Sequence, residues 1–278
     1  MEARAYSALP VGTNFLIAGY GRVDGHVSFD PALPITNVTA AINHYDFAYL
    51  RSFDLFGRTA TAAMLLPLVH GELTGLLQDQ TRSAERSGLG DLVFRFTTNL
   101  IGGPALTPAE FAQRERDTAV GASLVVIAPT GQNDPQRLIN IGQHRWAFKP
   151  GIGVTQPFGH WFTEASVASW LFTDNTNFFG GHDRGQNPIV TLEGHAGYDF
   201  RPGLWLAFDA TYYRGGETNI DGLAKNDPRE SARYGLTFSV PIVPGFSAKA
   251  YASNWYSHSN TGTYQVYGIS LQFRWFDD

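Results

Sequence analysis

The stretch Tyr267-Gly-Ile-Ser-Leu-Gln-Phe-Arg-Trp275 decides how this chain folds, because large apolar residues alternate along it with small or polar ones. Successive side chains of a β-strand point to opposite faces, so the stretch is predicted to be a strand with one apolar and one polar face. The apolar face consists of Tyr267, Ile269, Leu271, Phe273 and Trp275. Alternation alone leaves open whether this face meets a protein core or lipid.

Similar extended segments recur along the whole chain and are about 10 to 15 residues long, which exceeds the usual five or six residues of a soluble strand. In the segment 204–212, for example, Leu204, Leu206 and Phe208 alternate with residues that include Asp209 and Thr211. We predict twelve strands, at approximately 14–24, 40–53, 58–70, 88–100, 117–129, 145–157, 160–172, 188–200, 204–214, 231–243, 246–257 and 263–276.

The connections between these strands alternate between short and long. Tight Pro/Gly turns are predicted at 156–159, 201–203 and 243–245. The long connections at the other end are 25–39, 71–87, 130–144, 173–187 and 215–230, with a shorter one near 258–262. Short turns on one side and long loops on the other are typical of outer-membrane barrels, in which the turns are periplasmic. One connection, 101–116, is long but falls on the turn side.

A single helix is predicted, in that exceptional connection. Thr107 is an N-cap residue, Pro108 occupies the first helical position, and Glu110 completes a capping-box pattern. We therefore expect a short helix in a periplasmic turn, within 107–116.

The composition excludes several classes of protein. Cysteine is absent, which removes disulfides and thiolate chemistry, and the net charge of −5 disfavours nucleic acid as a partner. No apolar run approaches the roughly 18 residues of a membrane-spanning helix. The N-terminal residues Met1-Glu-Ala-Arg4 lack the apolar core of a signal peptide, and we interpret the chain as a mature form.

All six tryptophans fall at predicted strand ends, as expected for the two aromatic girdles of a membrane barrel. Tryptophans that cap the ends of a large soluble barrel are the alternative. Strand length, loop asymmetry and tryptophan position together predict an all-β fold: one domain over 1–278, a transmembrane antiparallel β-barrel of twelve strands. The sheet must close, because no strand edge can face hydrocarbon. We expect a monomer in the outer membrane of a Gram-negative bacterium, in contact with lipid and lipopolysaccharide.

One segment resembles a known family. It contains Pro129-Thr-Gly131 at the end of a strand, then Asn140 and Gly142, then a strand led by Trp146 that carries Pro150 and Gly153. This pattern resembles the outer-membrane channels named for the meta-cleavage pathway of phenol degradation. The resemblance implies a channel for the passive uptake of small hydrophobic or aromatic molecules. The chain departs from the family's usual end, because Asp277 and Asp278 follow the last aromatic residue, Phe276.

Charged residues on the polar faces of the strands are predicted to line the lumen: Arg22, Asp46, Arg95, Lys149, Glu164, Glu193, His195, Asp209, Arg233 and Arg274. A charge removed from water must be paired or hydrated, so these residues either fill the interior as ion pairs or form a polar constriction. Twelve strands lie between the filled eight-stranded barrel and the open porin, which predicts a narrow channel.

Two further candidates concern solute contact and gating. By parity, Trp170 and Trp205 face the lumen, where they either stack against an aromatic solute or pack at the rim. The loop after Pro129 is too long for a simple hairpin, and either folds into the barrel as a gate or shields the surface.

No catalytic motif is present, so we predict no enzymatic activity, no cofactor and no metal site. The alternatives are an outer-membrane enzyme acting on lipid or peptide, or a non-conducting structural barrel. His182, Asp183 and His258 are the residues that an enzyme would use, and Asp221 and Asp227 are the weak candidates for a cation.

Overall fold

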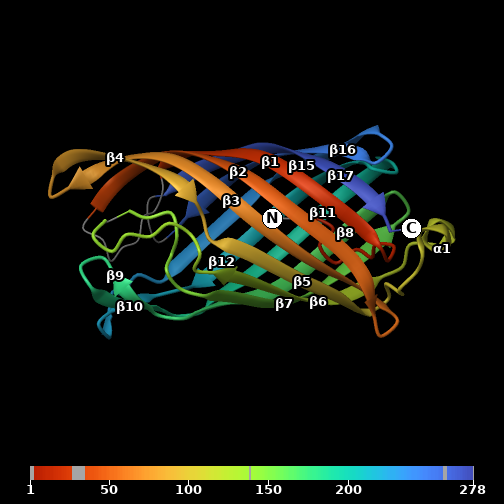
Figure 1. The fold of residues 1–278 in the computed structure, drawn as a ribbon, viewed down its shortest axis with the longest axis horizontal. Coiled ribbons are helices and arrows are strands. Elements are labelled where there is room, and N and C mark those ends of the chain that lie inside the picture. The colour runs from red at the N-terminus through yellow and green to blue at the C-terminus, as the bar shows by residue number, and fades with distance from the viewer. Residues whose placement is uncertain (1–2, 27–34, 138, 259–261, 278) are drawn as a thin grey trace.

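The structure is a computed structural model, and it describes residues 3–26, 35–137, 139–258 and 262–277. Its strands form one antiparallel sheet that closes where β2 pairs with β3 (Figure 1). The strands of this wall are β1 (Thr13–His26), β2 (Ile35–Leu55), β3 (Arg58–Leu77), β4 (Gln80–Leu89), β5 (Leu92–Ile101), β6 (Ala119–Ala128), β7 (Ala147–Phe158), β8 (Trp161–Phe172), β11 (Ile189–Arg201), β12 (Leu204–Gly215), β15 (Arg229–Val243), β16 (Phe246–Ser257) and β17 (Thr263–Phe276).

Strands β4 and β5 occupy one position in the wall, because they pair with consecutive parts of β3. Counting them as one interrupted strand gives twelve positions, which confirms the predicted closed barrel of twelve strands. The final strand β17 closes against β1 over its whole length, from Thr13 opposite Phe276 to His26 opposite Thr263.

The predicted loop at 71–87 is wrong. Strand β3 continues to Leu77 and turns directly into β4, and the turn residues Gln78 and Asp79 both have positive φ, 51° and 61°. Two such residues form the turn that matches the twist of a two-stranded ribbon. The hairpin extends beyond the barrel (Figure 1). Leu73 is buried in a cluster with Val38 and Ile139, and Ala84 packs against this cluster. Most other residues of β4 are polar, so its sequence lacks the apolar alternation that identifies a membrane strand.

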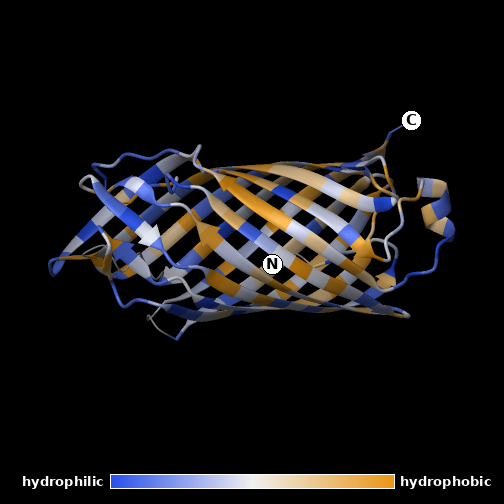
Figure 2. Ribbon diagram, turned by 90° about the horizontal axis from the view of Figure 1, so that it is seen from below, coloured by the Kyte–Doolittle hydropathy of each residue, from blue (hydrophilic) through white to orange (hydrophobic). Residues whose placement is uncertain are grey.

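Hydrophobic and hydrophilic residues alternate along the strands of the wall (Figure 2), and the exposed large apolar side chains show that its outer face is apolar. In β17, Ile269 and Leu271 are 51% and 55% exposed, although they lie in the middle of the strand. Leu236 and Phe208 on other strands are equally exposed. Large apolar side chains therefore surround the barrel with no protein covering them, as expected for contact with lipid.

Only three of the six tryptophans belong to this outer face. Trp146 and Trp161 are exposed, and Trp275 contacts the outward Tyr49 and Phe273. The interpretation of all six as girdle residues is wrong for the others: Trp170, Trp205 and Trp255 point inward, as contacts given below show. These tryptophans do lie at strand ends. Whether each one points to lipid or to the lumen depends on its place in the alternation along the strand, not on its distance from the strand end.

Helix α1 (Pro108–Gln113) is the predicted helix. Thr107 caps it, and the capping box with Glu110 is present in both directions. It lies at the end of the barrel that holds the C-terminus (Figure 1), which we call the turn end. Among the described residues, no helix is long and apolar enough to cross a membrane.

At the opposite end, which we call the loop end, two long connections pair into a second sheet. It consists of β9 (Asn175–Phe178), β10 (His182–Gln186), β13 (Thr218–Ile220) and β14 (Leu223–Ala224). The predicted loops at 173–187 and 215–230 are therefore partly ordered as strands. Parts of the loops expected at 25–39 and 258–262, and the residue Asp278, lie outside the described residues.

Asp277 is an integral part of the turn end. Its backbone N–H donates to Gly12, and its carboxylate accepts from Asn14 at 2.8 Å and from Arg51 at 2.6 Å. The residue after the last aromatic thus ties β17 to β1 and β2.

Candidate functional site

The N-terminal segment 3–12 enters the lumen from the turn end. Ala3 and Tyr6 are both only 4% exposed, and Ala3 packs with Phe162, Trp205 and Ala207 of the barrel wall. Near the turn end, Val11 bonds to Leu106 and Gly12 to Ser52. No periodic pattern in the sequence marks this segment, because it forms no regular element and is held by side chains from several strands.

Glycines in the wall make room for Tyr6. A Cβ atom at Gly153 or Gly121 would lie 2.3 or 2.8 Å from atoms of its ring. The hydroxyl of Tyr6 lies 2.9 Å from Ser123 Oγ, and Asn99 donates to its carbonyl at 2.9 Å. The ring is therefore fixed in a fitted groove of the inner wall.

The carboxylate of Glu164 holds the same segment through its backbone. It accepts from the N–H groups of Ala5 and Tyr6 at 3.1 and 3.3 Å, and from Thr155 Oγ1 at 2.6 Å. Beside it in the sheet, opposite Glu164, lies His195. His195 Nδ1 is 2.6 Å from the carboxylate of Asp209, which also accepts from Thr237 at 2.5 Å. These polar groups form a buried row across β8, β11, β12 and β15.

Asp199 also holds the segment. Its carboxylate forms ion pairs with both Arg4 and Arg116, and its side chain is only 5% exposed. The guanidinium of Arg4 also lies over the rings of Phe162 at 4.2 Å and Trp205 at 5.1 Å. Arg4, Arg116 and Asp199 were all missed as site residues.

Most of the charged residues predicted to line the lumen do lie on the inner face. Lys149 pairs with Glu193, Asp46 with His44 at 2.8 Å, and the guanidinium of Arg233 donates to Ser253 at 2.9 Å. Arg95 donates to Thr97 at 3.4 Å on the same face. The structure thus places Asp46, Arg95, Lys149, Glu164, Glu193, His195, Asp209 and Arg233 inside the wall.

The prediction for Arg22 is wrong. It stands opposite Tyr267, whose side chain faces outward, and it pairs with Asp24 on the same outer face. The reason is that β1 keeps its parity beyond the apolar belt, where an outward residue meets water and can be charged. Arg274 has inward parity but is exposed at the turn end, and the contact that the structure gives it is with the ring of Phe276, at 5.2 Å.

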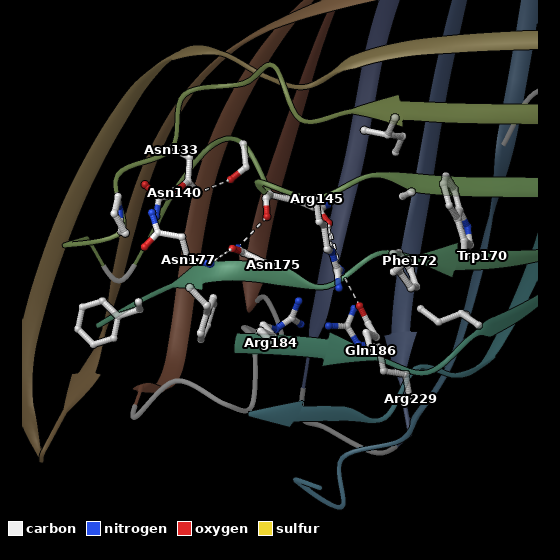
Figure 3. Close-up of a pocket in the computed structure, with 18 of the residues that line it drawn as sticks. Asn133, Asn140, Arg145, Trp170, Phe172, Asn175, Asn177, Arg184, Gln186 and Arg229 are labelled. Atoms are coloured by element: carbon white, nitrogen blue, oxygen red, sulfur yellow. Dashed lines mark hydrogen bonds between the residues drawn. The ribbon is translucent and has the colours of Figure 1, made fainter. Parts of the chain in front are cut away.

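A cavity of about 420 Å³ lies at the loop end, inside the wall and beneath the second sheet (Figure 3). Six aromatic residues line it: Trp170, Phe172, Phe178, Phe179, Tyr213 and Trp255. Trp255 stacks with Tyr213 at 4.7 Å and with Tyr264 at 5.3 Å between ring centroids. The other lining residues are mostly amides and arginines, among them Asn175, Gln186 and Arg145, so the cavity combines aromatic surface with many polar groups.

Trp170 and Trp205 both face inward but have different neighbours. Trp170 lines the cavity, and Lys149 lies 5.6 Å from its ring. Trp205 packs against the N-terminal segment instead, so it is not part of the cavity. Of the cavity's aromatics only Trp170 was predicted, although the inward parity of Trp255 in β16 was a usable signal.

The loop after Pro129 forms one wall of the cavity and is tied to Asp91, between β4 and β5. The two carboxylate oxygens of Asp91 accept from the N–H groups of Gly131 and Gln143, each at 2.8 Å. Thr130 Oγ1 accepts from Leu92 N at 2.9 Å. The backbones of Gly131 and Gly142 approach so closely that a Cβ at Gly142 would lie 2.7 Å from Gly131.

The remaining family-motif residues have distinct places. Asn140 accepts from Asp134 N at 2.9 Å and, with Gly142, lines the cavity. Trp146 and Pro150 lie on the exposed outer side of the wall. The motif therefore shapes a folded loop that hydrogen bonds to Asp91 hold in place.

The residues considered for other activities are engaged at the loop end. His182 Nδ1 lies 2.6 Å from Asp221, and both side chains are at least half exposed. Hydrogen bonds from the Asp183 N–H and from His182 hold the pKa of Asp221 below its usual range. Asp227 accepts from the N–H and hydroxyl of Thr218, each at 2.7 Å. Both carboxylates proposed for a cation thus have other partners.

Comparisons with known proteins agree with this architecture. The model of a family described as "Putative MetA-pathway of phenol degradation" matches residues 24–273. The fold is similar to that of an outer membrane channel from Pseudomonas putida F1, with a TM-score of 0.83, 20% identity, and coverage of 99% of this chain and 100% of that one. No curated protein matches the sequence.

More distant barrels share the fold alone. The transport unit of the autotransporter AIDA-I from Escherichia coli aligns with a TM-score of 0.53 and 7% identity, over 98% of this chain and 92% of that one. At this level of identity the likeness shows a similar fold and no more.

Proposed function

Because this chain belongs to the MetA-pathway phenol-degradation family, and because an aromatic cavity lies inside its barrel, we propose that it is a passive channel for small hydrophobic or aromatic molecules. The barrel is of the outer-membrane type, and we place it in the outer membrane of a Gram-negative bacterium. Its outer face would contact lipid, and its loop end would contact lipopolysaccharide. A monomer suffices, since one chain closes the barrel.

The cavity is the observation that supports this proposal best. It is reached from the loop end, and stacked rings of Tyr213 and Trp255 present flat apolar surface to an incoming solute. Stacking of an aromatic solute against such rings is favourable by about 0.5–1.5 kcal/mol per pair beyond burial of area. Selectivity then arises from the width and lining of the cavity, without a catalytic group.

The interior charges divide the path into two parts. The loop-end cavity is lined by aromatic rings, neutral polar groups and arginines, whereas the turn-end half contains the segment 3–12 with its attachments to Asp199 and Glu164. We infer that Lys149 and Glu193, with the buried row from Glu164 to Asp209, form the polar constriction below the cavity.

Uptake of radiolabelled naphthalene by lipopolysaccharide-bearing cells tests the proposal, because lipopolysaccharide slows unaided entry of apolar molecules. Cells that make the protein should accumulate naphthalene faster than cells that lack it. Ser231→Trp, which fills the cavity from its wall, should abolish most of the gain, whereas Tyr234→Trp on the outer face should not. Equal uptake with and without the protein would exclude the channel.

A further inference from the structure

One side of the inner wall carries a continuous apolar row. Each of five neighbouring strands contributes one inward apolar side chain that stands directly opposite the next one in the sheet. They are Ile127 of β6, Val93 of β5, Leu65 of β3, Ala48 of β2 and Ile17 of β1. Side chains in such positions are neighbours, with Cβ atoms about 4.5–5.5 Å apart. All five are partly exposed, and because they point inward this exposure is toward the lumen. We call these five residues the apolar track.

The track runs from the loop-end cavity toward the turn end. Ile127 lines the cavity and is the last residue but one of β6, at the loop end of that strand. Ile17 lies close to Thr13, where β1 begins at the turn end. The strands of a closed barrel are tilted, so a row of directly opposite residues winds along the barrel instead of staying at one level. The track therefore continues the apolar surface of the cavity downward.

The corresponding row on the other side of the lumen is polar. Ser166 of β8 stands opposite Glu193 of β11, Glu193 stands opposite Thr211 of β12, and Thr211 stands opposite Arg233 of β15. The lumen thus has a polar side that holds charges and water, and an apolar side that holds neither. An apolar solute gains free energy by staying in contact with the apolar side.

The N-terminal segment 3–12 meets the apolar side near the turn end. Ser52 of β2 and Thr59 of β3 donate to carbonyl groups of the segment, and both of these side chains are buried. Leu65 lies further toward the loop end on β3 and is partly exposed. The track is therefore open to the lumen between the cavity and the segment.

The track offers a solute no polar side-chain atom. Two charged residues flank it, and both are engaged on the same inner face: Asp46 with His44, and Arg95 with Thr97. A charged or hydroxylated solute on the track would lose water without gaining a partner there, which costs free energy. The track therefore suits an apolar molecule that carries no ionised group.

We propose that the apolar track is the path along which a neutral aromatic hydrocarbon moves from the cavity toward the turn end, in contact with Leu65 and Ile17. The inference rests on the proposed channel and adds to it the residues that determine passage below the cavity. Because Ile127 belongs to both the cavity and the track, the solute passes from one to the other without leaving apolar surface.

Protection of single cysteines locates the solute, because the chain has no cysteine of its own. Leu65→Cys on the track and Ser166→Cys on the polar side are labelled in the purified protein with a small water-soluble methanethiosulfonate, with and without naphthalene. Naphthalene at about ten times its half-protecting concentration should slow the labelling of Leu65→Cys about tenfold, by mass action, and leave that of Ser166→Cys unchanged. No protection of Leu65→Cys, or equal protection of both variants, would overturn the proposal.

Variants of matched size test passage along the track. Leu65→Asn keeps a similar shape but places an amide on the track, so naphthalene uptake by cells should fall about tenfold, whereas the apolar control Leu65→Met should retain it. Ile17→Thr and its control Ile17→Val form a second pair, in which the two new side chains differ only by a hydroxyl in place of a methyl group. Heat-modifiable migration on gels identifies the variants that fold. Folded Leu65→Asn and Ile17→Thr that carry naphthalene as fast as wild type would contradict the assignment.

Naphthalene uptake through the wild-type protein separates this inference from the proposed function. Uptake that depends on the protein while Leu65→Cys stays unprotected overturns only the track. Protection of Leu65→Cys in a protein that gives cells no gain in uptake supports the track as a binding surface and removes the channel.

Discussion

Asp199 shows how one carboxylate can organise the interior of a barrel. It lies on the inner face of β11 and pairs with Arg4 from the N-terminal segment and with Arg116 from the connection after α1. Two guanidinium groups compensate the desolvation of one buried carboxylate, and both belong to segments outside the wall. The residue thereby links the contents of the lumen to the turn end.

We predict that Asp199→Asn loosens the segment 3–12 and raises single-channel conductance in planar bilayers. Removing one partner of a buried pair costs about 3 kcal/mol, at the lower end of the usual range because the Arg116 side chain is 50% exposed. The control is Asp117→Asn, which removes the partner of Arg114 at an exposed position. Conductance that is the same in wild type and Asp199→Asn would show that the ion pairs do not hold the segment.

At the scale of elements, caps and turns determine where strands and helices end. Gly203 and Gly245 have φ values of 80° and 81°, which glycine adopts without strain after the preceding proline, so β11 and β15 turn sharply at the turn end. The helix α1 is only six residues long, and its stability depends on the Thr107–Glu110 capping box.

The capping box makes α1 sensitive to acid. Hydrogen bonds from the Thr107 side chain and backbone N–H lower the pKa of Glu110. A lowered folded-state pKa means that the carboxylate stabilises the cap above its ordinary pKa, and that this contribution is lost as the pH falls through the lowered value. Thr107→Ala should raise the pKa of Glu110 toward its ordinary value of about 4.3.

NMR titration of the Glu110 carboxyl in wild type and variant checks this prediction. Loss of the N-cap side chain should also cost about 1 kcal/mol locally, measured as faster amide exchange in 108–113, while exchange in β17 stays unchanged as the internal control. An identical pKa of Glu110 in both proteins would show that the capping box is not formed in solution.

At the scale of the whole molecule, the apolar belt and the closed sheet depend on each other. Closure satisfies every strand edge within the belt, and alternation then directs one set of side chains to lipid and the other to the lumen. Ile269 lies near the middle of β17, whereas Ile242 lies at the end of β15 beside a turn; both are more than half exposed, at 51% and 57%.

Arginine at these two positions should have different costs. Ile269→Arg places a charge at the middle of the belt and should destabilise the barrel by about 2–4 kcal/mol, whereas Ile242→Arg near the interface should cost about 0–1 kcal/mol. Urea titration of folding into lipid vesicles measures both free energies. Equal costs for the two variants would argue against a lipid-facing belt in this orientation.

The strands, the barrel and the family could be predicted from the sequence, because each depends on local patterns. Alternation along Tyr267–Trp275 and the Pro/Gly turns are readable within a few residues, and the Pro129-Thr-Gly131 motif is contiguous. The predicted strands agree with the observed strands of the barrel wall, whereas β4 and the short strands of the second sheet were not predicted, because their sequences lack a regular apolar alternation. The helix over 108–113 was equally readable from its cap.

The contents of the lumen were decided by the tertiary structure alone. Asp199 meets Arg4 across a sequence separation of 195 residues, and Arg145 meets Gln186 across 41, so no local pattern records either contact. The alternation of residues along a strand separates two faces, but it does not show where the apolar belt ends. Arg22 lies beyond the belt, where an outward side chain can be charged, and was therefore wrongly assigned to the lumen. Alternation follows from the backbone geometry of each single strand, whereas the partner of an inward side chain depends on how the twelve strands, the N-terminal segment and the connections meet in space.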